Sequence, residues 1–494
     1  MFFLLLLFLC SLLAIFILKN KNSDYWKKRN VVQVSGLLSK FYFGNVSLPE
    51  VYKKVYDDYP GEPYVGIFLG MRPALLIRDV ENVQAVMAGE FQSFYKRGIT
   101  LNPQDVLADN VLFIDEFGRW KILRHKLSPI FTSSKLKNMF YILERCGRDF
   151  VERIKQDPKN VDNPFEALYS YTTASIAASV FGIDAQVKNT MDSPLLDMVK
   201  KAIAPTLKSN LIFAIANISP RLLQVFNLKS FGDYEEFFVG VVRKVIENRR
   251  NEKQRRHDFI DICLELQDQG MMKDFTTGYE LEPSVEVLAA QAFFFFVAGA
   301  DTSANTMHFT LLELSNNPNI LKKVHNEIDE VFDKCDEKLT YSDVYEKFPY
   351  LDKVVKEALR KFPPIGMIQR KCTKDTILPV GGVRVDKDCT IVLPVYAIHR
   401  DENYYPNPDV FDPDRFSPEN EAEIPNYAYL PFGEGNRICL GMRLARLQVK
   451  VGLAWLLRRY TLVPQSVVPE HFEPSVFALR ASKYRYDLVP RSTN

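Results

Sequence analysis

The sequence predicts a mainly helical protein with a small β-rich part, built as a single large domain behind an N-terminal transmembrane anchor. Most of the 494 residues follow helical patterns of apolar residues, and strand-like stretches occur in two places only. No Gly/Ser-rich or Pro-rich linker divides the chain, and no repeat has a solenoid period. An apolar run without charges occupies residues 2–18. We therefore expect an anchor at 2–18 and one folded domain at 30–494.

The apolar run at residues 2–18 spans roughly 25 Å as a helix, at the short end of what crosses a bilayer. A cleaved signal peptide is the alternative, but no basic segment precedes the run and no small-residue cleavage pattern follows it. Basic residues follow the run, so the positive-inside rule places the remaining chain in the cytosol. These residues are Lys19, Lys21, Lys27, Lys28 and Arg29. The sequons at Asn45 and Asn217 are then expected to carry no glycan.

Strands and helices are expected in a definite order along the folded domain. Strand-like stretches lie at residues 64–69, 74–78 and 383–395. Helical patterns lie at residues 119–127, 234–250, 284–315, 350–361 and 442–457. The apolar segment 211–228 is interrupted by Asn217, Pro220 and Arg221. It is too broken to span a membrane, and either dips into the membrane surface or forms the ends of core helices.

Composition favours an apolar cavity and argues against several classes of protein. Hydrophobic residues make up 47% of the chain, which includes 36 Phe. A net charge of only +2 gives a nucleic-acid partner no electrostatic support, so we expect none. The seven cysteines are scattered and never form Cys-x-x-Cys. This pattern argues against a disulfide framework or a structural zinc site and favours a reducing compartment.

A glycine-rich segment near the C-terminus contains the one cysteine in a reactive context. The segment reads Pro431-Phe432-Gly433-Glu434-Gly435-Asn436-Arg437-Ile438-Cys439-Leu440-Gly441. Its glycines allow the backbone to turn tightly and to approach a flat ligand. Cys439 precedes a helix N-terminus, which stabilises a thiolate, and Arg437 is able to bind an anion on the same ligand. Taken alone, the segment is equally compatible with a Gly-rich turn around a buried cysteine.

This segment also resembles the haem-binding signature F-x-x-G-x-R-x-C-x-G of the cytochrome P-450 superfamily. The matching residues are Phe432, Gly435, Arg437, Cys439 and Gly441. Asn436 departs from the pattern, because many members have proline there. The resemblance implies a haem-thiolate catalytic domain with haem b as cofactor and Cys439 as the axial ligand of the iron. Phe432, Gly433 and Gly441 are then expected in the haem-binding loop.

Other short motifs resemble the same family in its haem contacts. Trp120 and Arg124, one helical turn apart, are both able to donate to a carboxylate and resemble W-x-x-x-R, whose pair contacts a haem propionate. Arg97 and Arg370 align with further propionate-binding positions of microsomal members. Without the resemblance, the simpler interpretation is a packed Trp and a solvated Arg.

A third motif is interpreted as structural. Glu357 and Arg360 share one helix face and resemble E-x-x-R, while Arg415 resembles the arginine that completes that network. Taken alone, Glu357 and Arg360 form one more surface ion pair of little energetic value. The resemblance implies a lock behind the haem loop.

The long helix expected at residues 284–315 resembles the family in its motif [A/G]-G-x-[D/E]-T-[T/S], here residues 298–303. The resemblance implies a groove over the iron, with Ala298 against the haem and with Asp301 and Thr302 as catalytic residues that deliver protons to bound oxygen. Gly299 weakens a helix by about 1 kcal/mol, so we expect it to make room for another group. The alternative for Thr302 is a bond back to the carbonyl four residues earlier.

The substrate cavity is expected beside this groove. Gln291, Phe294 and Phe295 fall near Thr302 at helical periodicity, so we expect them to line it. Ile365 and a substrate-contacting turn at Phe477 are expected to complete its wall.

The resemblance covers nearly the whole chain and points to the insect microsomal detoxification branch through residues 131–140 and 397–401. It implies a monooxygenase that inserts one oxygen atom of O2 into lipophilic substrates, such as plant toxins or insecticides. The alternative is a hormone or lipid hydroxylase of the same family. Two further rivals are a haem-thiolate isomerase or dehydratase that needs no reductase, and a haem-binding sensor or carrier.

Electrons must come from a separate protein, since no G-x-G-x-x-G follows a strand in this chain. The resemblance implies NADPH as the electron source, acting through a membrane-bound NADPH-cytochrome reductase, with cytochrome b5 as an additional partner. It also implies the endoplasmic reticulum membrane, with the catalytic domain on the cytosolic side. The residues expected to contact the reductase are Lys121, Lys126, Arg443 and Arg446.

Overall fold

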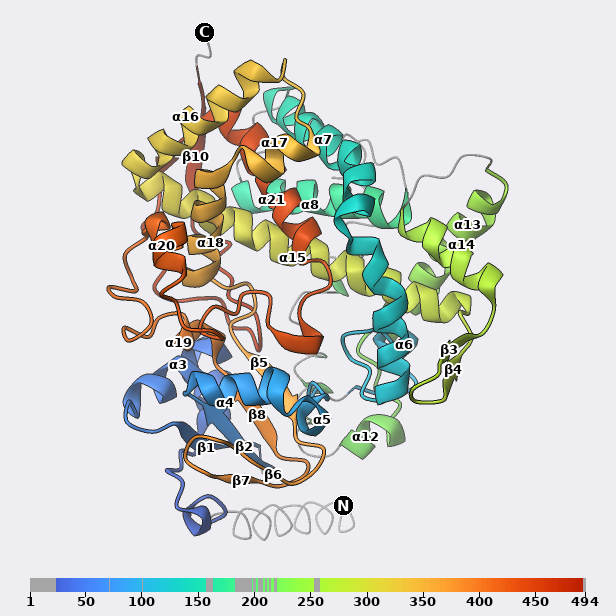
Figure 1. Cartoon of the computed structure of the whole chain (residues 1–494), viewed down its shortest axis with the longest axis vertical. Helices are drawn as coiled ribbons and strands as arrows, with labels where there is room; N and C mark the ends of the chain where they lie inside the picture. The colour runs from blue at the N-terminus through green and yellow to red at the C-terminus, as the bar shows by residue number, and fades with distance from the viewer. Residues whose placement is uncertain are drawn as a thin grey trace, which may run out of the picture.

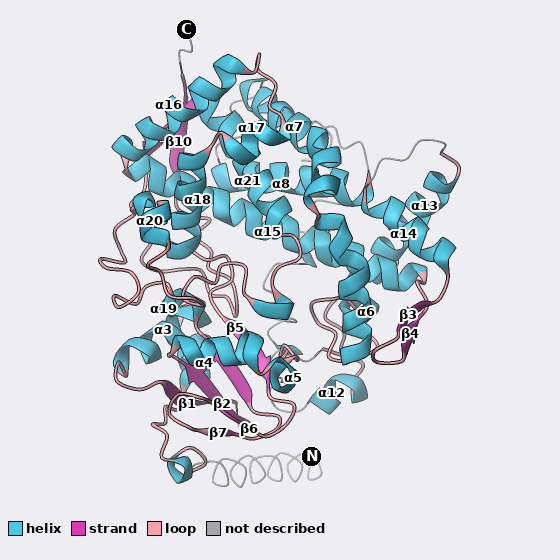
Figure 2. Cartoon of the chain, viewed as in Figure 1, coloured by secondary structure: helices cyan, strands magenta, loops and turns pink. Residues whose placement is uncertain are grey.

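Helices make up most of the molecule, and its main sheet lies at one end (Figures 1 and 2). The computed structural model describes residues 24–491 apart from 71, 100, 157–162, 183–197, 199–200, 203–207, 209–210, 213–214, 217–219 and 253–257. The expected anchor at 2–18 and the sequon at Asn217 lie outside the described residues. The predicted fold class, mainly α with a small β-rich part, is confirmed.

The longest central helix, α15 (Val285–Asn316), crosses the middle of the helical part in Figure 1, and the other long helices surround it. Its side chains are mostly buried between neighbouring helices, and it is the one described helix long and apolar enough to cross a membrane. Two thirds of its most apolar window are buried inside the protein, so α15 is a core helix. The other long helices are α6 (Phe117–Leu127), α7 (Ser133–Gln156), α8 (Pro164–Phe181), α13 (Glu235–Arg250), α14 (Phe259–Gln269), α16 (Pro318–Lys334), α18 (Pro349–Lys361) and α21 (Met442–Arg459).

The main sheet has four strands in the order β1-β2-β8-β5. They are β1 (Tyr64–Leu69), β2 (Arg72–Ile77), β8 (Thr390–Leu393) and β5 (Ile368–Lys371). Strands β2 and β8 are parallel and pair residues 74–76 with residues 390–392, whereas the other two pairs are antiparallel. The sheet packs with the short helices in a hydrophobic cluster of its own. These are α2 (Leu37–Gly44), α3 (Leu48–Asp58), α4 (Val80–Gln84), α5 (Phe91–Phe94) and α19 (Val395–Ile398).

Three two-stranded sheets and three short α-helices complete the strands and α-helices of the described residues, and short 3-10 and π-helical turns lie between them. The sheets pair β3 (Met272–Asp274) with β4 (Tyr279–Leu281), β6 (Thr376–Ile377) with β7 (Arg384–Val385), and β9 (Tyr460–Pro464) with β10 (Tyr486–Pro490). The helices are α12 (Pro220–Val225), α17 (Tyr341–Glu346) and α20 (Pro418–Glu421).

Most predicted elements are found with bounds close to those expected, but the strand expected at residues 383–395 is wrong as a single element. It divides into β7 and β8, which belong to different sheets. Asp388 between them has a φ of 70°, a left-handed conformation that no strand continues through. The chain then enters α19 directly after β8.

Candidate active site

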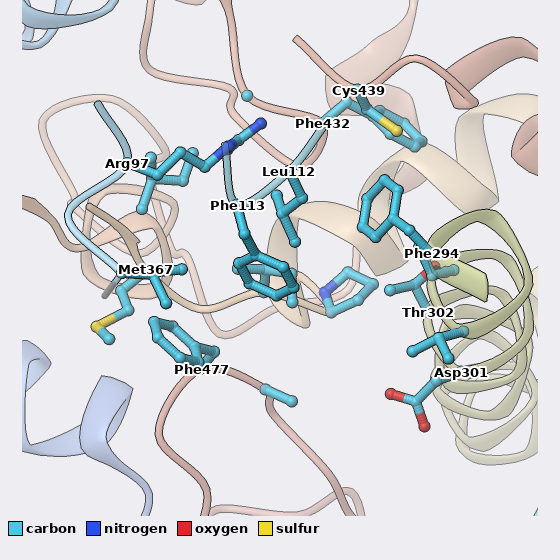
Figure 3. Close-up of a pocket in the computed structure, with 18 of the residues that line it drawn as sticks. Arg97, Leu112, Phe113, Phe294, Asp301, Thr302, Met367, Phe432, Cys439 and Phe477 are labelled. Carbon is cyan, nitrogen blue, oxygen red and sulfur yellow. Dashed lines mark hydrogen bonds between the residues drawn. The ribbon is translucent and has the colours of Figure 1, made fainter. Parts of the chain in front are cut away.

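A cavity of about 1060 Å³ lies between α15, the loop before α21, and the edge of the main sheet. In Figure 3, Cys439 lies on one side of it and faces the helix that carries Phe294 and Thr302. Phe113, Met367 and Phe477 lie on the remaining side. The cavity therefore brings together a thiol, a helix groove and an apolar chamber.

The cysteine loop is held in place by close backbone contacts. Gly435 has a φ of 71°, and a Cβ there would lie 2.2 Å from the carbonyl oxygen of Met87. Only glycine fits this approach to the π-helical turn Ala85–Gly89. The Cys439 amide donates to the Phe432 carbonyl at 2.9 Å, and α21 begins three residues later, at Met442.

Among the described cysteines, Cys439 is the only exposed one, and its exposed surface faces the cavity. Burial in the protein raises the pKa of its thiol, while the Gly441 amide and the cations Arg124 and Arg97 act to lower it. The pKa of the thiol stays raised overall, and these three groups offset the effect of burial in part. Phe432, Gly433 and Gly441 lie in the same cavity wall, where the sequence predicted the haem loop.

Four arginines from distant parts of the chain meet at this end of the cavity. Arg97, Arg124, Arg370 and Arg437 all line it, and none forms an ion pair with a carboxylate of the described residues. Burial and mutual repulsion lower the pKa of Arg97 to about 10 and that of Arg437 to about 9. The pKa of Arg370 is also well below its usual range, mainly through burial.

The donors of this arginine cluster are only partly used. The buried Nε atoms of Arg97, Arg370 and Arg437 have no hydrogen-bond partner among the residues that the structure describes. Their other nitrogens bond backbone carbonyls, as Arg97 does at Arg437 O, 3.1 Å away. Buried cations without anions are costly, so the cluster requires an anionic ligand. The two propionates of a haem would supply that charge, and the site therefore fits haem.

Trp120 also lies in the cavity wall, on α6, one turn from Arg124. The Arg437 guanidinium lies 4.4 Å from the centre of the Trp120 ring. This cation–π contact orients Arg437. The sequence alone did not indicate that Trp120 and Arg437 are in contact.

The groove residues of α15 lie across from the cysteine. Ala298, Asp301 and Thr302 all line the cavity, and the Thr302 hydroxyl donates to the Ala298 carbonyl at 2.6 Å. The structure thus contains the hydrogen bond from Thr302 to the carbonyl four residues earlier, which was the alternative role expected for this hydroxyl. Because Thr302 also borders the cavity, the bond orients its hydroxyl oxygen as an acceptor at the groove.

The space left by the missing side chain of Gly299 is filled by a residue of a neighbouring helix. A Cβ at Gly299 would lie 2.5 Å from Cδ1 of Ile176, which comes from α8. The missing side chain therefore allows α8 to approach α15, and the expectation that Gly299 makes room for another group is confirmed. Gly299 also lines the cavity.

Asp301 has a partner that sequence reasoning missed. Its carboxylate pairs with Arg480 (Nη2–Oδ1 2.8 Å), and both residues line the cavity. Asn305 and His308 lie one and two turns further along α15 and bond the carbonyls of Leu479 and Ala481. These three α15 residues fix the turn at 479–481, beside the predicted substrate contact Phe477.

The predicted cavity residues separate into two groups. Phe294, Phe295, Ile365 and Phe477 line the cavity, together with Phe293. Gln291 does not, and its assignment to the cavity is wrong. The Gln291 amide is fully buried, accepts from the Val111 amide and donates to the Asp109 carbonyl, both at 2.9 Å. It therefore holds the loop before α6 against α15.

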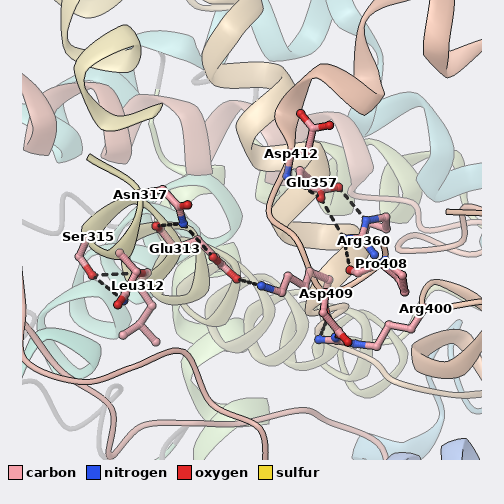
Figure 4. Close-up of polar contacts among 12 residues, drawn as sticks. Leu312, Glu313, Ser315, Asn317, Glu357, Arg360, Arg400, Pro408, Asp409 and Asp412 are labelled. Carbon is pink, nitrogen blue, oxygen red and sulfur yellow. Dashed lines mark hydrogen bonds and ion pairs between the residues drawn. The ribbon is translucent and has the colours of Figure 1, made fainter. Parts of the chain in front are cut away.

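Glu357 and Arg360 of the predicted lock lie in one buried polar network (Figure 4). Glu357 and Arg360 have no exposed surface and share two hydrogen bonds of 2.7 and 2.8 Å. Arg415 approaches Glu357 at 3.4 Å. Arg360 also donates to the carbonyls of His399 and Pro408. None of the three lines the cavity, so their role is structural.

The fold and the site together define a protein whose cysteine loop and central helix face each other across a cavity that would accept a haem. Comparison with known proteins supports this class. The family model "Cytochrome P450" matches residues 34–488. "Probable cytochrome P450 6a13" of Drosophila melanogaster is 34% identical over 92% of each chain. "Cytochrome P450 6B6" of Helicoverpa armigera is 34% identical over 89% of this chain and 88% of its own.

The chain belongs to the cytochrome P450 family, and many of its relatives are insect enzymes of the group numbered 6. "Cytochrome P450 6B1" of Papilio polyxenes, for example, is 34% identical over 95% of each chain. The predicted resemblance to the insect branch is confirmed. The protein is accordingly a monooxygenase, and haem iron is the cofactor of its family.

Proposed function

We propose that this monooxygenase oxidises lipophilic xenobiotics at the cytosolic face of the endoplasmic reticulum, with electrons from NADPH delivered by a reductase. The overall reaction is RH + O2 + NADPH + H⁺ → ROH + H2O + NADP⁺. The observation that carries the proposal is the apolar chamber, which is lined by Phe113, Phe294 and Phe477. A substrate that fills it needs apolar surface and no charge.

Each group of residues has a separate task in this proposal. When bound, haem would supply the oxygen chemistry, and Cys439 would hold its iron. Arg97, Arg124, Arg370 and Arg437 would hold its propionates. Phe294 and Phe295 exclude water from the substrate side.

Proton delivery is the task proposed for α15. Two protons must reach the oxygen that leaves as water. Thr302 offers its hydroxyl at the groove, and Asp301, one residue earlier, offers a carboxylate held by Arg480. Both residues border the cavity.

The reductase is proposed to bind on the side of the cysteine loop, with cytochrome b5 as a second donor. Two of the four expected contacts are occupied within the protein. Lys121 pairs with Asp274 at 3.2 Å, and Arg446 pairs with Asp352 at 2.8 Å. Lys126 and Arg443 form no ion pair within the described residues, which favours them as contacts for an acidic partner.

Membrane attachment is proposed to rest on the anchor at 2–18 and on the apolar segment that includes α12. Val225 and Phe226, at the end of α12, are 74% and 63% exposed, which supports a second contact with the membrane surface. Deletion of residues 2–18 is expected to weaken membrane association without loss of haem. A glycan on Asn45 in the full chain made in microsomes would reverse the proposed topology.

The test of the proposed function is reconstitution of the full chain with haem, an insect NADPH-cytochrome reductase and lipid vesicles. Product formation is measured against a panel of plant toxins, insecticides, fatty acids and steroid hormones. We expect hydroxylated products from the xenobiotics, dependent on both NADPH and the reductase. Turnover confined to hormones or fatty acids would favour the endogenous hydroxylase, and peroxide-dependent turnover without reductase would contradict the proposal.

A further inference from the structure

His399 lies directly after α19, is fully buried, and uses both ring nitrogens on backbone groups. Its Nε2 accepts from the Leu430 amide at 2.7 Å. Because an amide N–H is always a donor, the ring proton lies on Nδ1. The Nδ1–H group donates to the Arg360 carbonyl at 3.0 Å. The neutral ring thus bridges two segments that are far apart in sequence.

One end of this bridge is the buried lock. Arg360 donates from Nη1 to the His399 carbonyl at 2.8 Å, while the His399 ring donates to the Arg360 carbonyl. The two residues therefore exchange hydrogen bonds. Glu357 holds the Arg360 guanidinium from the other side, so the position of His399 is set by a network with no exposed surface.

The other end of the bridge is the start of the cysteine loop. The Leu430 carbonyl accepts from the Gly433 amide at 3.0 Å, and the Phe432 carbonyl accepts from the Cys439 amide at 2.9 Å. Leu430, Phe432 and Cys439 all line the cavity. The described contacts of Glu357, Arg360 and Arg415 include none to residues 430–441, so His399 is the side chain that joins the lock to the loop.

The residues just before Leu430 are held in the same way. The Tyr429 ring stacks on His399, with centres 5.6 Å apart and an interplanar angle of 22°. Its hydroxyl donates to the Lys356 carbonyl at 3.0 Å. The Tyr405 hydroxyl donates to the Ala428 carbonyl at 3.1 Å. His399 is the last of these anchors before the loop enters the cavity.

We propose that His399 is a positioning residue, which fixes the cysteine loop to the α18 lock and thereby sets the distance of Cys439 from the iron. The inference rests on the proposed ligation of haem by Cys439. Without the His399 acceptor, the Leu430 amide is buried and unpaired. The balance between the seated and the displaced loop is then expected to shift roughly ten-fold toward the displaced form, the cost of one such donor.

The experiment compares three variants of the full, haem-loaded chain. His399→Phe keeps an aromatic ring against Tyr429 but has no acceptor for Leu430. His399→Gln places a carbonyl oxygen near the position of Nε2 and is the conservative rescue. His308→Phe is the matched control, since His308 is equally buried and bonds a backbone carbonyl, that of Ala481, but has no contact with the cysteine loop.

Two quantities are measured for each variant: the melting temperature, and the fraction of the reduced CO complex that shows the red-shifted Soret band of thiolate ligation. We expect His399→Phe to lower this fraction strongly, His399→Gln to retain it, and His308→Phe to lose melting temperature alone. Equal thiolate fractions in the two Phe variants would overturn the proposal. If His399→Phe does not fold, loss of the thiolate band in His399→Gln would overturn it.

A Cys439→Ala variant separates this inference from the function on which it depends. If Cys439→Ala keeps the red-shifted band, the proposed ligand is wrong and His399 has no ligand to position. If Cys439→Ala loses the band while His399→Phe keeps it, the ligand stands and only the positioning role of His399 fails.

Discussion

Asp301 and Arg480 form an ion pair across the wall of the cavity, with Nη2 and Oδ1 2.8 Å apart. The pair joins the central helix to the turn that follows Phe477, although the two residues are far apart in sequence. In Figure 3 the Asp301 carboxylate points away from Cys439. The ion pair therefore fixes the substrate turn against α15, and the Asp301 carboxylate borders the same cavity as Thr302.

Replacement of Cys439 by Ala is expected to abolish the red-shifted Soret band of the reduced CO complex. Cys439 is the only described cysteine in the cavity wall. Cys372 and Cys389 are buried near the sheet, and burial raises the pKa of both thiols. Cys372→Ala and Cys389→Ala therefore serve as controls that keep the band. A normal band in Cys439→Ala would exclude it as the axial ligand.

Replacement of Thr302 by Ala is expected to uncouple NADPH consumption from product formation. General acid assistance contributes about 10²–10⁴-fold to a step that it serves, and the Thr302 hydroxyl borders the cavity next to Asp301. We expect peroxide to be released while the thiolate spectrum and substrate binding persist. Ser303 also borders the cavity, so Ser303→Ala measures how far the adjacent hydroxyl contributes. If NADPH and product remain matched in Thr302→Ala, the proton path lies elsewhere and Thr302 only bonds its own helix.

Gly299→Ala is expected to destabilise the protein through Ile176. The new Cβ would lie 2.5 Å from Ile176 Cδ1 and 2.7 Å from Cγ1, and overpacking of a core costs about 1–3 kcal/mol. Ile176→Ala alone leaves a cavity and costs about 2–5 kcal/mol. In the double variant the two losses are expected to offset each other in part. Thermal and urea unfolding measure the effect, and simple addition of the two losses would show that the contact is not the cause.

His308 is expected to make the protein less stable in acid. Burial lowers the pKa of its ring from the usual 6.5 to about 4, so the folded state favours the neutral form. Its contribution is complete above pH 6.5 and is lost as the pH falls toward 4, because the unfolded chain then binds the extra proton. The fall in melting temperature between about pH 7 and pH 5 should be smaller in His308→Phe than in the native protein. Equal falls would mean that His308 does not contribute.

Local sequence was enough to predict helices α6, α13, α15, α18 and α21, strands β1 and β2 and the cysteine loop, because their signals lie within a few neighbouring residues. The apolar run of α15 and the glycines around Cys439 are examples. Contacts between distant segments were beyond reach. Gln291 has the period of a cavity residue, yet its amide bonds the backbone at Asp109 and Val111. A helical pattern shows which face of a helix is buried, but it does not show which backbone groups of other segments need a hydrogen-bond partner at that face.

The partners Arg480 and Ile176 were missed for the same physical reason. Arg480 lies in a turn without a periodic pattern, and only the folded chain brings it to Asp301. Ile176 is one of many apolar residues on α8, and nothing local marks it as the neighbour of Gly299. His399 lies in the segment 397–401, which indicated only the resemblance to the insect branch. Its two ring hydrogen bonds depend on where α18 and the cysteine loop lie in the folded protein.

The parallel pairing of β2 with β8 has a consequence for the order in which the protein is made. Residues 74–76 leave the ribosome long before residues 390–392, with which they pair. Until then β2 has a bare edge, and such an edge is a template for aggregation. Contacts so distant in sequence also slow folding. During synthesis the β1–β2 hairpin therefore keeps its apolar residues exposed until residues 390–392 have been made. We expect chaperones to bind mainly to this hairpin during that interval.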